Sequence, residues 1–128
     1  MRPASLAALA ATLILAAIVT VLTLGPSLVP GKALGGDKVQ HALGFGAIIL
    51  PIALVRPRWL IVAAPAVIAG GGLIEILQDH VGRDGDLADW VSDIAGVGAM
   101  ILLALALRRI ARIAVPSGHR FRRARPDL

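Results

Sequence analysis

The chain has 128 residues, of which 57% are hydrophobic, and a formal net charge of +5 at pH 7. Because a soluble domain of this length cannot bury so large an apolar fraction, the sequence predicts one domain that lies mostly in lipid. The chain has no cysteine, which excludes disulfides, thiolate catalysis and cysteine-ligated zinc.

The first two apolar segments are predicted to cross a membrane as helices. One covers about residues 5–24, close to the ~20 residues that a spanning helix needs, and stops at a Gly-Pro pair. A cleaved signal peptide is the alternative for this segment, but the long apolar run and the lack of an Ala-x-Ala site favour a retained helix. The other covers about residues 38–55 and ends where charge and proline follow at residues 56–58.

Two further spans are predicted at about residues 59–80 and 88–107. Short loops between the spans predict an all-α, integral membrane four-helix bundle with up-down topology over residues 1–115. The last segment, residues 116–128, is polar and basic, and we expect a cytoplasmic tail without fixed structure.

The charged residues sort by the ends of the spans. Ten of the 13 basic residues lie at the two termini or between the second and third spans, whereas seven of the eight acidic residues lie at the opposite ends. Since basic residues favour the cytoplasmic side, both termini are expected in the cytoplasm. Basic residues that mark helix ends, with little aromatic content, indicate membrane lipid rather than nucleic acid as the partner.

Polar side chains gather at the acidic mouth of this bundle, where they are costly in lipid and need partners or a function. Helical spacing puts each of three sets on one helix face. The sets are Asp37, His41 and Phe45 in the second span, Glu75, Gln78 and Asp79 in the third, and Asp86, Asp89, Asp93 and Gly96 in the fourth.

Structural roles account for many of these residues. Asp37 is expected to be an N-cap, and Asp86 with Asp89 resembles a capping pair at the start of the fourth span. Gln78 and Asp93 could join Glu75 in a hydrogen-bonded network that links helices and needs no ligand. Gly96 and Gly98 are expected to provide a small-residue surface for close helix packing.

Taken together, these residues resemble the VanZ-like family of bacterial membrane proteins. The pattern combines D-K-x-x-H with E-x-x-Q and D-x-x-x-[N/D]-x-x-G, and it is carried by Asp37, Lys38, His41, Phe45, Glu75, Gln78, Arg83, Asp89, Asp93 and Gly96. Two positions depart from it: Asp93 stands where many members carry Asn, and Met100 stands where a second glycine is usual. The resemblance implies a multi-pass protein of the bacterial inner membrane and cell envelope, whose namesake is linked to glycopeptide resistance. That phenotype does not follow from membership of a family.

The leading functional interpretation is a non-enzymatic envelope protein whose outer pocket binds or shields an envelope lipid or precursor. Its expected binding residues are Asp37, Lys38, Gln78, Arg83, Asp89 and Asp93. The alternative is a lipid-phosphate or lipid-linked-intermediate hydrolase or transferase, with Glu75 and His41 as catalytic acid–base residues and Lys38 with Arg83 holding phosphate. A divalent ion held by Glu75, Asp89 and Asp93 would then make an anionic substrate tolerable in this acidic mouth. A transporter, the third class, would need an oligomer.

Overall fold

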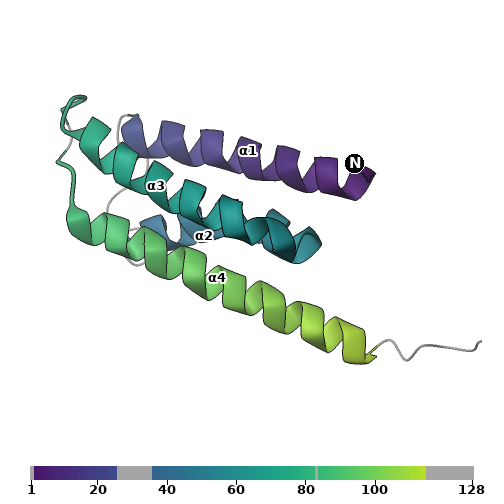
Figure 1. Cartoon of the computed structure of the whole chain (residues 1–128). Coiled ribbons are helices and arrows are strands. Elements are labelled where there is room, and N and C mark those ends of the chain that lie inside the picture. The colour runs from purple at the N-terminus through teal and green to yellow at the C-terminus, as the bar shows by residue number, and fades with distance from the viewer. Residues whose placement is uncertain (1, 26–35, 83, 115–128) are drawn as a thin grey trace, which may run out of the picture.

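The computed structural model describes residues 2–25, 36–82 and 84–114, and the predicted tail and Arg83 lie outside these ranges. The regular structure of the described residues is entirely helical, which confirms the all-α prediction. The elements are α1 (Pro3–Leu24), α2 (Asp37–Val55), the short 3-10 helix η2 (Pro57–Trp59), α3 (Leu60–Gln78) and α4 (Leu87–Ala114), lying side by side (Figure 1).

Four helical segments are long and apolar enough to cross a membrane, as the sequence predicted. They are Pro3–Leu24, Asp37–Val55, Pro57–Gln78 and Leu87–Ala114. Large apolar side chains cover their outer surfaces; Ile61, for example, is 82% exposed and Leu102 is 70% exposed. A water-soluble domain would not present so many such side chains, whereas lipid solvates them well.

Hydrogen bonds show which helix ends lie together. At one end, Arg56 Nε donates to Ser5 Oγ at 2.6 Å, which joins the end of α2 to the start of α1. The guanidinium group of Arg108 donates to the carbonyl of Leu54, so the later part of α4 lies there too. α4 is longer than predicted and continues beyond residue 107, the predicted end of the span. Arg108 lies in this extension and bonds to α2.

Among the described helices, α2 makes its most extensive contact with α4, and a glycine of α4 lies in this contact. A Cβ atom at Gly96 would lie 2.0 Å from the carbonyl oxygen of Ala42, so only glycine permits this approach of the two backbones. Gly98 has nothing within 4 Å of such an atom. The predicted small-residue surface is therefore correct at Gly96 and wrong at Gly98.

Below the polar mouth, the core is apolar, and two polar side chains within the bundle bond to backbone carbonyl groups of a neighbouring helix. Phe45, Ile48, Ile49, Ile74 and Val97 form the buried cluster. Thr12 Oγ1 donates to the carbonyl of Ile48 at 3.0 Å, and Trp90 Nε1 donates to that of Ile68 at 2.8 Å. These bonds satisfy polar groups that lipid could not, and they join α1 to α2 and α4 to α3.

An apolar cavity of about 700 Å³ lies between α1, α2 and α3. Leu13, Phe45 and Val67 are among its lining residues, and Arg58 and Trp59 stand at one end of it. His41, Glu75 and Asp93 do not line this cavity. The space between these helices is therefore separate from the polar residues that the sequence singled out.

Candidate functional site

Three buried polar side chains meet where α2, α3 and α4 come together, and we call them the polar centre: His41, Glu75 and Asp93. Their exposed fractions are 6%, 8% and 0%. His41 Nδ1 lies 3.0 Å from Asp93 Oδ1 and 3.8 Å from Glu75 Oε1. Each helix thus contributes one ionisable group to a site that lies about a turn inside the end of α3.

Neighbouring residues fix the positions of these side chains. The ring of Phe45, one turn along α2, stacks on that of His41 with a centroid distance of 6.3 Å and an interplanar angle of 9°. Gly71 on α3 leaves room for Asp93, because a Cβ atom there would lie 2.6 Å from Asp93 Oδ2. Gly71 belongs to a run of three glycines at residues 70–72, and such a run in a membrane helix favours a close contact of this kind.

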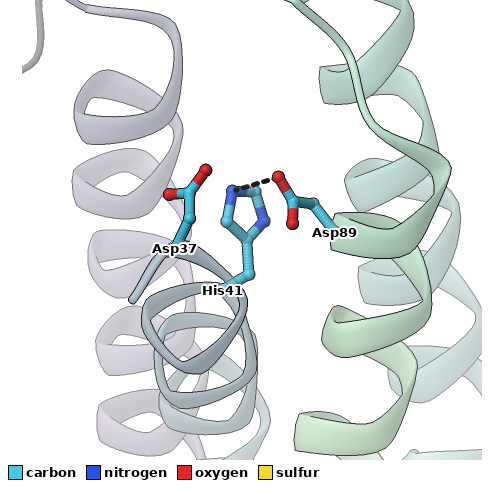
Figure 2. Close-up of side chains that lie close together, drawn as sticks. All are labelled: Asp37, His41 and Asp89. Atoms are coloured by element: carbon cyan, nitrogen blue, oxygen red, sulfur yellow. Dashed lines mark ion pairs between the residues drawn. The ribbon is translucent and has the colours of Figure 1, made fainter. Parts of the chain in front are cut away.

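A second layer, which we call the rim, consists of Lys38, Asp86 and Asp89. Lys38 Nζ lies 2.8 Å from Asp86 Oδ2 and 3.1 Å from Asp89 Oδ1. The other oxygen of Asp89 lies 3.9 Å from His41 Nε2, so the rim contacts the polar centre. Figure 2 shows the His41 ring between the side chains of Asp37 and Asp89, with the contact to Asp89 dashed.

Asp86 connects the rim to Glu75 through its backbone. Its N–H donates to Glu75 Oε2 at 2.9 Å, and its side chain accepts the N–H of Ala88 at 2.8 Å. Asp86 therefore caps α4, as predicted, but the reciprocal bond expected from Asp89 is not made because Glu75 takes that N–H. Hydrogen bonds from Lys38 and then from the Ala88 N–H lower the pKa of the Asp86 carboxyl below its ordinary value.

The expected N-cap at Asp37 is wrong. Gly36, with a φ of 96°, precedes α2 as the capping residue, and Asp37 is the first residue of the helix without a capping bond. Asp37 is exposed and stands beside His41 (Figure 2). It is therefore available to ligands at the mouth.

Two other predicted residues, Gln78 and Asp79, lie apart from the polar centre. Gln78 is buried, but its Nε2 donates to the carbonyl of Thr23 at 3.1 Å, so it joins α3 to α1. Asp79 accepts the N–H of Gly85 at 3.0 Å and shapes the connection to α4. The predicted network of Gln78 with Asp93 is therefore replaced by one that links His41 to Asp93 and Glu75 to Asp86. The position of Arg83 is outside the described residues.

Two oxygens of the polar centre have no hydrogen-bond partner among the described residues. They are Glu75 Oε1 and Asp93 Oδ2, and both are buried. An unpartnered buried carboxylate oxygen is costly, so the site is chemically incomplete as a purely structural network. Within the described residues, two groups could hold a metal ion, with ligand atoms within 4.8 Å of one another: His41 with Glu75 and Asp93, and His41 with Asp37 and Asp89.

Comparisons with protein-family models, with curated proteins and with solved structures found no match. The resemblance to the VanZ-like family therefore stays a prediction based on the sequence pattern. The function of this chain has to be argued from the geometry and charge of the site itself.

Proposed function

We propose that this chain is a multi-pass protein of the bacterial inner membrane that binds the polar group of an envelope lipid or precursor at its polar centre. The observation that carries the proposal is a pair of buried carboxylate oxygens, Glu75 Oε1 and Asp93 Oδ2, that have no hydrogen-bond partner in the part of the chain that the structure describes. Buried ionisable groups in membrane helices generally mark functional sites, and these two lie next to the rim, where the side chains of Lys38 and Asp86 are about half exposed. The VanZ-like pattern supports the cell envelope as the location.

The distribution of charge supports the orientation. Arg58 and the basic end of α4 lie at one end of the bundle, and the rim with its acidic residues lies at the other. Basic ends favour the cytoplasm, so the proposal has an up-down bundle with cytoplasmic termini and a polar centre that opens outward. A ligand would then reach His41 from the outer leaflet or from outside the cell.

Charge also limits what can bind. The polar centre and rim contain Glu75, Asp86, Asp89 and Asp93 against two basic side chains, Lys38 and His41. The enzymatic alternative needs Lys38 to hold phosphate, but two carboxylates already engage its ammonium group. Binding of a ligand at the polar centre, without a reaction, is therefore better supported than the enzymatic alternative.

Ligand retention tests this proposal. The full chain is extracted with its native lipids, and the small molecules that remain bound are identified by mass spectrometry. We expect an envelope lipid or precursor to be retained by the unchanged chain and lost from Glu75→Gln. The glutamine keeps an oxygen that can accept the Asp86 N–H, so thermal unfolding in detergent should stay within the range of the control.

The matched control is Leu102→Ala, which removes a 70% exposed side chain on α4. It should leave both ligand retention and the unfolding temperature unchanged. Equal retention by the unchanged chain and by Glu75→Gln would contradict the proposal and leave Glu75 as a residue that joins α3 to the start of α4.

A further inference from the structure

We infer that His41, Glu75 and Asp93 hold a first-row divalent metal ion of the zinc or manganese class. The inference rests on the proposed function, since an ion with an open coordination position would bind an oxygen of a headgroup at the polar centre. One imidazole and two carboxylates are a ligand set that suits such ions better than Mg²⁺ or Ca²⁺, which prefer oxygen alone.

The distances fit such an ion. Ligands about 2.0–2.2 Å from a tetrahedral zinc ion lie about 3.3 Å from one another. His41 Nδ1 is 3.0 Å from Asp93 Oδ1, in a hydrogen bond that the ion would replace, and 3.8 Å from Glu75 Oε1; one ligand atom from each of the three residues lies within 4.8 Å of the others. Small side-chain movements therefore bring all three to bonding distance without moving a helix.

The remaining atoms of the ligands are held as a metal site requires. His41 Nε2 lies 3.9 Å from Asp89 Oδ2, longer than a hydrogen bond, and a small closing movement would give the carboxylate–histidine bond that orients a metal-binding ring. Glu75 Oε2 accepts the Asp86 N–H at 2.9 Å, so Oε1 is left to bind the ion. Asp89 is in turn fixed by Lys38 Nζ at 3.1 Å.

Charge balance in lipid points to the same occupant. Two ionised carboxylates beside a protonated His41 leave one negative charge in a buried site. A divalent ion with a neutral imidazole and the same carboxylates leaves none. Buried charge is costly in a membrane, and metal binding requires the neutral imidazole in any case.

The second possible group, His41 with Asp37 and Asp89, is less suited to an ion. Asp37 is exposed, whereas all three residues of the polar centre are buried. Both unpartnered buried oxygens belong instead to Glu75 and Asp93. A substitution of Asp37 is therefore a suitable control, because it changes a residue beside His41 and leaves the three inferred ligands unchanged.

Metal binding to the full chain tests the inference directly. The protein is purified in detergent, treated with EDTA and dialysed against Zn²⁺, against Mn²⁺ or against Mg²⁺; bound metal is then counted by mass spectrometry. We expect one Zn²⁺ or Mn²⁺ per chain with little bound Mg²⁺, and loss of that ion in Asp93→Asn. Asp89→Asn, which acts through the His41 ring, should weaken binding about 10- to 100-fold.

Asp37→Asn should bind the ion as the unchanged chain does. Thermal unfolding of each variant is also measured without metal. Failure of the unchanged chain to bind either ion overturns the inference. So does binding that survives Asp93→Asn but is lost in Asp37→Asn, because that result assigns the ion to the outer group.

The two proposals can fail separately. If Zn²⁺ or Mn²⁺ binds but no lipid or precursor is retained, the metal site stands and the proposed function falls. If a ligand with an amine is retained through Glu75 while no metal binds, the function stands and the metal site falls.

Discussion

Lys38 shows how a single residue links the rim to the polar centre. Its ammonium group donates to Asp86 at 2.8 Å and to Asp89 at 3.1 Å, and Asp89 in turn faces His41. Because Asp86 also donates its backbone N–H to Glu75, one lysine orders both carboxylates that support the polar centre. These rim contacts depend on side chains and a loop backbone that helical spacing does not describe.

Replacing Lys38 should change how Asp86 titrates. A carboxyl whose pKa is lowered on folding stabilises the fold above its ordinary pKa, and this contribution is lost as the pH falls through the lowered value. Lys38→Met removes the main cause of that lowering, so the pKa of Asp86 should rise toward its ordinary value and the contribution of Asp86 to stability should become smaller. NMR titration of the Asp86 carboxyl carbon measures this pKa in the unchanged chain and in Lys38→Met.

Arg58→Met is the matched control for this titration, since Arg58 lies at the other end of the bundle. It should leave the Asp86 titration where it is. An unchanged Asp86 titration in Lys38→Met would show that the two residues do not pair in solution.

At the scale of elements, the helices were predictable and their contacts were only partly so. Apolar runs of spanning length and prolines or charges at their ends are local signals, and they placed the ends of the four spans within a few residues, except the end of α4, which lies at residue 114 rather than 107. Spacing also put His41, Glu75 and Asp93 on defined faces. Which groups then met depended on helix rotation and on the path of residues 79–86, and so Gln78 bonds to α1 instead.

The glycines of α4 give a prediction at this scale. Gly96→Ala places a Cβ atom 2.0 Å from the Ala42 carbonyl, so α2 and α4 have to separate. The free energy of unfolding should fall by about 1–3 kcal/mol, as in other overpacked sites. Gly98→Ala, with nothing within 4 Å, should cause no loss. Thermal or denaturant unfolding in detergent compares them; equal effects would contradict the packing of α2 on α4.

For the whole molecule, the proposed function depends on where the polar centre lies relative to a membrane. The four apolar segments are long enough to cross one, and the acidic rim and the basic residues lie at opposite ends of the bundle. The residues of the polar centre lie near the rim end, about a turn inside α3. If that end faces outward, an envelope ligand or a metal ion can reach His41 without crossing the bilayer.

Labelling of single cysteines in intact cells tests this claim most directly, because the chain has no cysteine of its own. Asp84→Cys lies in the connection before α4 and Arg58→Cys lies in η2, and both side chains are exposed. A membrane-impermeant thiol reagent should label Asp84→Cys from outside and should label Arg58→Cys only after the cells are permeabilised. Labelling of Arg58→Cys in intact cells, with Asp84→Cys protected, would contradict the account and open the polar centre to the cytoplasm.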